Sequence, residues 1–110
     1  MGFRPLWKWL KGIGAMAAPR HVYVFTYDIS RDSRRARVAD ILSTSLIRVQ
    51  RSVFEGRLTV AGARRLVRQV APLLSAEDSL RAYAVTQSGR SATIVVGNPP
   101  LAEETDFLLL

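Results

Sequence analysis

The sequence predicts an α+β sandwich, in which two helices cover one face of a mostly antiparallel β-sheet. Strand-like and helix-like segments alternate along the chain, and β-branched and aromatic residues dominate the strand-like ones. A length of 110 residues with 48% hydrophobic content suffices for one core and one domain. The expected order of strand, helix, strand region, helix, strand and strand is that of a ferredoxin-like sandwich. Because such a small domain has a thin stability margin, we also expect a partner subunit.

The first strand is expected over residues 21–27, where the run HVYVFTY suits a central strand buried on both faces. Residues 28–33 follow it and contain Asp and Ser side chains that can cap a helix. Apolar residues at helical spacing then predict a first helix over residues 34–45.

Residues 46–58 return to strand-type sequence, with Glu55-Gly56 as the signal of a bend or bulge. The pattern leaves open whether this is one bent strand or a pair split near residues 50–52. Thr59 is expected to cap a second helix that ends near Pro72. The apolar side of this helix comprises Val60, Ala63, Leu66, Val67, Val70 and Leu74, and Arg64, Arg65 and Arg68 lie on the other side.

Two further strands are expected at residues 79–85 and 92–96, joined by a turn at Gln87 to Arg90. Asn98-Pro99-Pro100 breaks the chain again. The apolar run Phe107 to Leu110 has to pair with its own sheet or with the edge of a neighbour's sheet.

Residues 1–20 differ from the rest, with two Trp, four basic residues and no acid. Lys8 and Lys11 interrupt the apolar run, so it fits neither a transmembrane span nor a signal peptide, although a membrane-surface amphipathic helix is one interpretation. We favour an atypical extension that is disordered or that arises from a start site placed too far upstream of Met16. The domain itself then spans residues 21–110, with no membrane partner.

The residue inventory restricts the metal chemistry that is available. The chain has no cysteine, which excludes disulfides and thiolate metal sites and is compatible with a cytoplasmic location. Its one histidine, His21, is expected to be an ordinary strand residue, so zinc is not expected. Any metal would be a hard cation, Mg²⁺ or another divalent cation such as Mn²⁺, on carboxylate oxygens.

Charge points to a polyanionic partner. Lys and Arg number 16 against 9 Asp and Glu, which gives a net charge of +7 and a pI near 11.0. Such a surface attracts nucleic acid, although the arginine-rich solvated surface of a high-GC organism explains the same numbers equally well. The basic residues concentrate in the middle of the chain, at Arg31, Arg34, Arg35, Arg37, Arg48, Arg51, Arg57, Arg64, Arg65 and Arg68.

Acidic residues are the remaining candidates for catalysis. The chain contains no Ser-His-Asp set, no Cys-His pair and no phosphate-binding G-x-x-x-x-G-K-[ST] run. Asp28 directly follows the first strand, and strand ends are where open α/β sheets place ligands. The alternative is that Asp28 caps the turn or the helix that follows.

Three blocks resemble the signature of the CRISPR-associated Cas2 family of small adaptation nucleases. They are VFTYDIS at residues 24–30, RRARV at residues 34–38 and RVQRSVFEG at residues 48–56, in the order and spacing of the family. The resemblance continues through the second helix, the strand around Arg81 and Tyr83, and the IVVG run at residues 94–97. It therefore covers the chain from His21 onward.

The resemblance implies a ferredoxin-like fold, a symmetric homodimer and a last strand exchanged between subunits. It implies a metal-dependent endonuclease acting on RNA or DNA, which bridges two copies of the large CRISPR integrase during spacer acquisition. Asp28 would bind the metal. The supporting residues would be Tyr27, Arg35, Arg37, Arg48 and Phe54.

Physical arguments support a paired site. Mg²⁺ keeps several waters and usually takes one or two protein carboxylates, so Asp28 from each subunit could share one ion across the dimer axis. That ion would activate a water, while arginines steady the phosphate. Two facing carboxylates repel each other without a cation, so we expect metal binding to depend on pH.

Two departures from the family and two alternatives remain. The family often has Tyr where this chain has Arg51, and the N-terminal extension is atypical. The first alternative function is a non-catalytic DNA-binding scaffold of the integrase complex. The second is a toxin-type ribonuclease that shares the fold.

Overall fold

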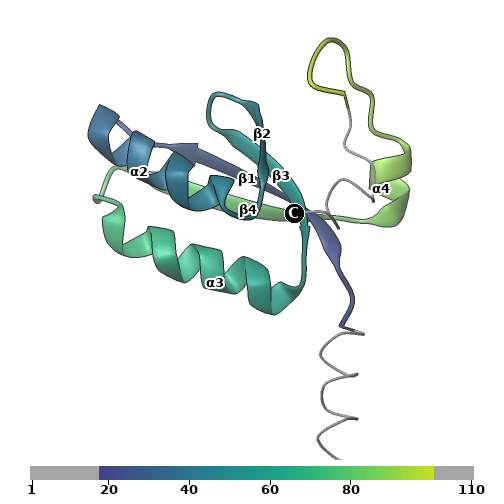
Figure 1. The fold of residues 1–110 in the computed structure, drawn as a ribbon, viewed down its shortest axis with the longest axis horizontal. Helices are drawn as coiled ribbons and strands as arrows, with labels where there is room; N and C mark the ends of the chain where they lie inside the picture. Colours follow the sequence, from purple (N-terminus) through teal and green to yellow (C-terminus); the bar gives the residue numbers. More distant parts are fainter. Residues whose placement is uncertain (1–17, 101–110) are drawn as a thin grey trace, which may run out of the picture.

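The computed structural model describes residues 18–100, which form one sheet with two long helices against it (Figure 1). The α+β class and the element order through residue 85 are as the sequence predicts. The elements are β1 (His21–Asp28), α2 (Asp32–Ser43), β2 (Ile47–Gln50), β3 (Val53–Leu58), α3 (Val60–Val70), the 3₁₀ turn η1 (Ala71–Leu73), β4 (Ser79–Val85) and α4 (Gln87–Ser91).

The sheet has the strand order β2-β3-β1-β4, and all three neighbouring pairs are antiparallel. β1 is therefore central, as expected. From Tyr23 onward its burial alternates, however: Tyr23, Phe25 and Tyr27 are buried, Val24 and Thr26 are half-buried, and on the second face only Val22 is buried. The prediction of a strand buried on both faces is wrong, because the helices cover only one of them.

The core lies between the sheet and the two helices. Phe25 and Phe54 from the sheet and Val38, Leu42 and Val70 from the helices are its largest fully buried side chains. Burying side chains of this size stabilises the fold by about 1.5–3 kcal/mol each, so the core determines how α2 and α3 lie on the sheet.

The first helix lies two residues earlier in the chain than predicted, at Asp32–Ser43, whereas the second begins where it was predicted. α2 begins at Asp32, and its N-cap residue Arg31 makes no side-chain capping bond, so the expected Asp or Ser cap is absent. Asp32 instead pairs with Arg35 one turn later. α3 begins as predicted, because the Thr59 hydroxyl accepts a hydrogen bond of 3.0 Å from the Gly62 amide.

Residues 46–58 form a pair of strands, which settles the alternative that the sequence left open. The chain turns at Arg51-Ser52, and the register shifts between Arg48 and Gln50. The bulge predicted at Glu55-Gly56 is wrong, since β3 continues through both residues. Gly56 has a packing role instead: a Cβ there would lie 2.6 Å from Leu46 Cδ2.

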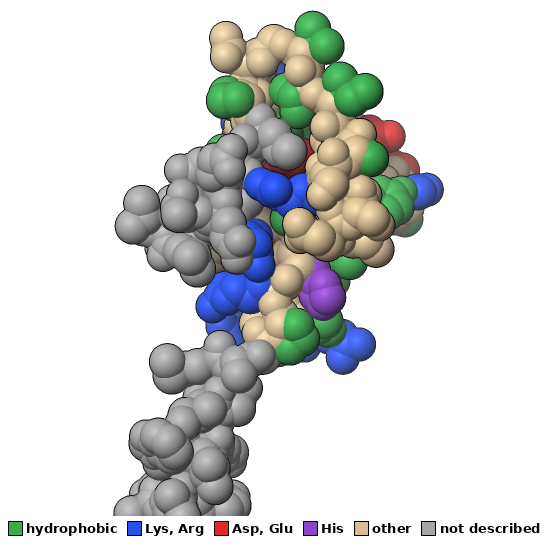
Figure 2. Space-filling view, turned by 90° about the vertical axis from the view of Figure 1, so that its right-hand side faces the viewer, with side chains coloured by type: hydrophobic (Ala, Val, Ile, Leu, Met, Phe, Trp, Pro, Cys, Tyr) green, Lys and Arg blue, Asp and Glu red, His purple; other side chains and the backbone are tan. Residues whose placement is uncertain are grey.

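The segment after β4 is the main difference. The predicted turn at residues 87–90 is the short helix α4, and residues 92–96 form no strand in the part of the chain that the structure describes. Ile94 and Val96 are 86% and 94% exposed. A strand needs an edge to pair with, and this segment pairs with none here. Figure 2 shows hydrophobic side chains at the top of the molecule, over the loop that follows α4.

Both termini of the chain include residues outside the described range. The first 17 of the 20 residues assigned to the N-terminal extension, and the run Phe107 to Leu110, fall there. Within residues 18–100, no helix is long and apolar enough to span a lipid bilayer.

Candidate functional site

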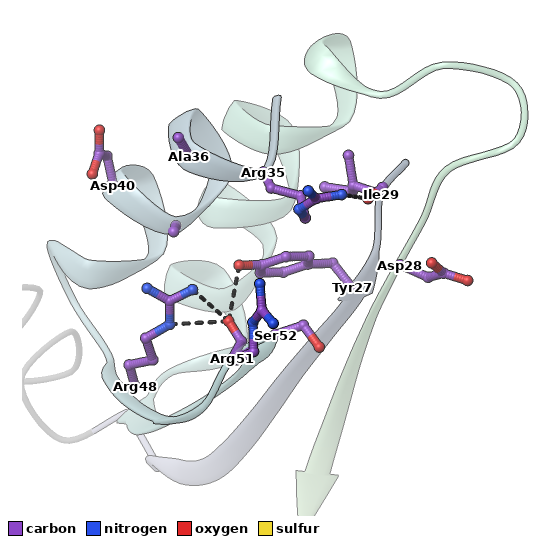
Figure 3. Close-up of a pocket in the computed structure, with 10 residues that line it drawn as sticks. Tyr27, Asp28, Ile29, Arg35, Ala36, Asp40, Arg48, Arg51 and Ser52 are labelled. Carbon is purple, nitrogen blue, oxygen red and sulfur yellow. Dashed lines mark hydrogen bonds between the residues drawn. The ribbon is translucent and has the colours of Figure 1, made fainter. Parts of the chain in front are cut away.

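Asp28 ends β1 as an exposed side chain that points away from the helices. Side chains alternate along a strand, so Asp28 lies on the opposite face of the sheet from Tyr27. Figure 3 shows this division: Asp28 points to one side of β1, while Tyr27 and Arg35 lie on the other. We call the face that carries Asp28, Thr26, Val24 and Val22, which α2 and α3 do not cover, the helix-free face.

A pocket of about 600 Å³ lies on the helix side of the end of β1 (Figure 3). The three arginines that line it come from different elements: Arg35 from α2, Arg48 from β2 and Arg51 from the β2–β3 turn. Tyr27, Asp28, Ile29, Ala36, Ala39, Asp40 and Ser52 complete its lining.

Arg35 holds the turn that follows Asp28. Its Nη1 donates hydrogen bonds to the carbonyls of Ile29 and Ser30, at 2.7 and 3.0 Å, and its Nη2 pairs with Asp32. These bonds occupy the guanidinium with the protein's own backbone. Arg35 therefore stabilises the strand end from the helix side of the sheet.

Asp78 holds the same turn from the loop before β4. Its carboxylate accepts hydrogen bonds from the backbone amides of Ser75 and Ser30 and from Nε of Arg34, the last at 2.9 Å. The Ser75 amide is the largest of the influences that hold the pKa of Asp78 well below its usual range. Sequence reasoning missed Asp78, because its partners lie as far as 48 residues away along the chain.

Arg48 and Tyr27 together hold the β2–β3 turn. Both side chains donate to the carbonyl oxygen of Arg51, at 2.9 Å from Arg48 Nε and 3.2 Å from the Tyr27 hydroxyl (Figure 3). The Arg48 guanidinium lies 5.4 Å from the centre of the Phe54 ring, which in turn stacks on Tyr27 at 6.3 Å. Phe54 is fully buried, so its contacts are those of a core residue.

Of the six residues predicted for the site, the structure brings four together and separates two. Tyr27, Arg35, Arg48 and Phe54 cluster on the helix side, Asp28 points to the helix-free face, and Arg37 is exposed on α2. Arg51, the departure from the family pattern, lines the pocket beside Arg48.

The helix-free face carries its own charged and aromatic groups. The sheet register pairs Asp28 with Ser79, Thr26 with Arg81 and Val24 with Tyr83, so all six side chains share this face. Arg81 Nη1 donates a hydrogen bond of 2.7 Å to the Tyr83 hydroxyl, which raises the pKa of the guanidinium. Burial raises the pKa of Glu55, which pairs with Val24 on the same face, although the charge of Arg90 opposes this.

Residues 18–100 of one copy do not supply a complete metal site. The described residues hold no group of three or more His, Asp or Glu side chains that could bind an ion together. Asp28 offers oxygen ligands of the kind that Mg²⁺ prefers, on an exposed surface with space for waters. Asp28 therefore fits such an ion where a second carboxylate joins it.

His21, the one histidine, begins β1, and its ring packs edge-on against that of Tyr23, with 6.2 Å between the ring centres.

Comparison with known proteins gives consistent matches. Residues 21–93 match the family model described as CRISPR associated protein Cas2. A curated relative from Synechocystis, named a CRISPR-associated endoribonuclease Cas2, is 39% identical over 90 residues, which cover 80% of this chain and 97% of the relative.

Solved structures also share the fold. The crystal structure of a hypothetical protein from Thermus thermophilus superimposes with a TM-score of 0.67 at 36% identity, covering 76% of this chain and 99% of that one. A chain of a structure titled a partial Cas6-RT-Cas1--Cas2 complex gives a TM-score of 0.63, covering 76% of this chain and 92% of that one. Its 24% identity shows likeness of fold alone.

Proposed function

Because the chain belongs to the Cas2 family of CRISPR-associated proteins, we propose that it is a divalent-cation-dependent endonuclease that works as a homodimer in spacer acquisition. Its substrate class is the phosphodiester backbone of RNA or DNA, and the name of the Synechocystis relative specifies RNA. The observation that carries the proposal is the position of Asp28, an exposed carboxylate at the end of the central strand on the helix-free face.

A second copy of the chain completes the site. A single carboxylate is a poor Mg²⁺ site, whereas Asp28 from two copies supplies the one or two protein carboxylates that the ion usually takes. Pairing through the helix-free face would place both carboxylates at the shared surface. When bound, the ion supplies an activated water and offsets charge on the phosphate.

The protein's own contribution is to hold Asp28 in position. Arg35 and Asp78 bind the two backbone residues that follow it, so the strand end has little freedom to move. Arg48 and Tyr27 hold the neighbouring turn. Arg37, exposed on α2, is available to contact a backbone phosphate.

The segment after β4 supports subunit pairing. The exposed apolar side chains of Ile94 and Val96 would be buried if residues 92–96 joined the edge of a partner's sheet. In a single copy both β2 and β4 are edge strands and offer such an edge. The resulting dimer, with a charge of +7 per chain, would bridge two copies of the large integrase and bind prespacer DNA between them.

Cleavage assays on purified protein test the nuclease. Wild type, Asp28→Asn and the control Glu77→Gln, an exposed acid in the loop before β4, are compared on single-stranded RNA and duplex DNA with Mg²⁺, with Mn²⁺ and with chelator. We expect metal-dependent cleavage that Asp28→Asn abolishes and Glu77→Gln retains. Cleavage that survives in Asp28→Asn would refute the assignment. Spacer acquisition in cells that persists with Asp28→Asn would make the scaffold the biological role.

The absence of cysteine allows a direct test of the paired geometry. Asp28→Cys is expected to form covalent dimers with a short thiol-reactive crosslinker, whereas Asp40→Cys, exposed on α2, is not. Light scattering on the wild-type protein measures the dimer independently. A dimer in which Asp28→Cys stays uncrosslinked would contradict a site built from two Asp28 carboxylates.

A further inference from the structure

An arginine and a tyrosine share the helix-free face with Asp28. Directly opposed residues of an antiparallel pair point to the same side of the sheet, and the β1–β4 register opposes Asp28 to Ser79 and Thr26 to Arg81. Arg81 is therefore the diagonal neighbour of Asp28. Such neighbours lie about 7–8 Å apart, within reach of a long side chain.

Tyr83 gives the Arg81 side chain a defined orientation. The hydrogen bond of 2.7 Å from Arg81 Nη1 to the Tyr83 hydroxyl joins two exposed side chains on the same face of one strand. Tyr83 is 49% exposed in a single copy of the chain. Its hydrogen bond holds the guanidinium, which reduces the freedom that Arg81 would lose on binding a ligand.

Three other arginines near Asp28 are engaged with the protein itself. Arg34 pairs with Asp78, Arg35 with Asp32 and the Ile29 carbonyl, and Arg48 with the Arg51 carbonyl. Within residues 18–100, Arg81 forms no ion pair and keeps donors beyond the one given to Tyr83.

Arg57 also belongs to the helix-free face, but it lies at the opposite end of β1. The register pairs it with Val22, six residues before Asp28, and its side chain is half-buried. Arg81 is thus the arginine that the register sets beside Asp28.

We infer that Arg81, oriented by Tyr83, binds a backbone phosphate of the nucleic acid held at Asp28. A guanidinium presents a planar fork of donors that matches two oxygens of a phosphate. The inference rests on the proposed function for the place of the nucleic acid. The family resemblance assigned the phosphate contact to Arg35 and Arg48, which lie on the helix side of the sheet. The inference assigns it instead to Arg81, which lies on the same face as the Asp28 carboxylate.

Binding without metal tests this contact independently of cleavage. Affinities for a short single-stranded RNA and for duplex DNA are measured in chelator over a range of salt concentrations. A lost phosphate contact lowers the slope of log K against log salt by about 0.7 on a single strand and about 0.9 on a duplex. We expect that reduction for Arg81→Gln. Arg81→Lys should keep most of the slope, and Tyr83→Phe should weaken affinity a few-fold with the slope unchanged.

A matched variant and the subunit state identify the cause of any change. Arg65→Gln removes the same charge from α3, on the helix side of the sheet, and is expected to change the slope less than Arg81→Gln. Equal slopes for wild type and Arg81→Gln, or an equal loss in Arg65→Gln, would overturn the inference. So would dissociation of Arg81→Gln into monomers at concentrations where wild type is dimeric, since Arg81 would then belong to the subunit interface.

The two proposals fail in different ways. A wild-type protein that binds nucleic acid but does not cleave it with Mg²⁺ refutes the nuclease and leaves the Arg81 contact standing. A protein that cleaves through Asp28, with Arg81→Gln binding at the wild-type slope, refutes only the contact.

Discussion

Truncation of Phe54 separates a packing role from a catalytic one. The family resemblance places Phe54 among the functional residues, whereas the structure buries it completely between Tyr27 and the helices. Phe54→Ala should destabilise the domain by about 3–5 kcal/mol, the usual cost of removing a buried aromatic ring. That is a large part of the roughly 5–15 kcal/mol by which native domains are stable. Any loss of activity would then follow from unfolding.

Phe54→Leu is the informative variant, because it keeps an apolar side chain in the core. We expect a loss of up to about 1.5 kcal/mol from imperfect packing. The missing contact with the Arg48 guanidinium, 5.4 Å from the ring centre, adds about 0.5–1 kcal/mol. The total of at most about 2.5 kcal/mol should leave the protein folded under assay conditions.

Urea denaturation at one fixed protein concentration measures both variants, since subunit association makes stability depend on concentration. Cleavage is then measured at saturating substrate on Phe54→Leu that is shown to be folded and dimeric. We expect turnover within a few-fold of wild type. A loss of more than tenfold in a folded, dimeric variant would show that the ring takes part in the chemistry and would refute the packing assignment.

Three further variants test the elements around the site. Asp78→Asn should make the stability of the fold less dependent on pH in acid. The lowered pKa of Asp78 stabilises the fold at pH values above the ordinary Asp pKa, near 3.9, and this contribution is lost as the pH falls towards the pKa in the folded state. Urea midpoints measured from pH 7 to pH 3 for wild type and variant test this. Thr59→Ala removes the α3 cap and should cost about 1 kcal/mol, or roughly 4–8 °C in melting temperature. Gly56→Ala forces a Cβ against Leu46 and should cost about 1–3 kcal/mol in denaturant titrations.

For each of these variants, one result would contradict the prediction. If the stability of Asp78→Asn fell with decreasing pH as steeply as that of wild type, groups other than Asp78 would cause the loss of stability in acid. Wild-type melting of Thr59→Ala would mean that the cap adds nothing measurable to the folded state. A Gly56→Ala protein as stable as wild type would show that Leu46 can move aside without cost.

The local features of the fold could be predicted from the sequence. The β-branched and aromatic run of residues 21–27 predicted β1, and Thr59 with the apolar spacing after it predicted α3. These signals are local, because a strand pattern or a cap depends on neighbours in the chain. The prediction of a strand at residues 92–96 was wrong, because a strand also needs the edge of another strand to pair with, and the local sequence does not specify that edge.

The sequence by itself determined the family, the basic character of the chain and Asp28 as the candidate acid. Only the tertiary structure decided which groups surround that acid, since its neighbours come from strands and loops distant in sequence. The β1–β4 register places Arg81 beside Asp28, and Asp78 and Arg35 each form hydrogen bonds with the turn after it. Asp28 borders the pocket, but alternation along β1 points its side chain to the opposite face of the sheet from Tyr27 and Arg35. A motif records the order of residues along the chain, whereas a site depends on which faces and strands the fold brings together.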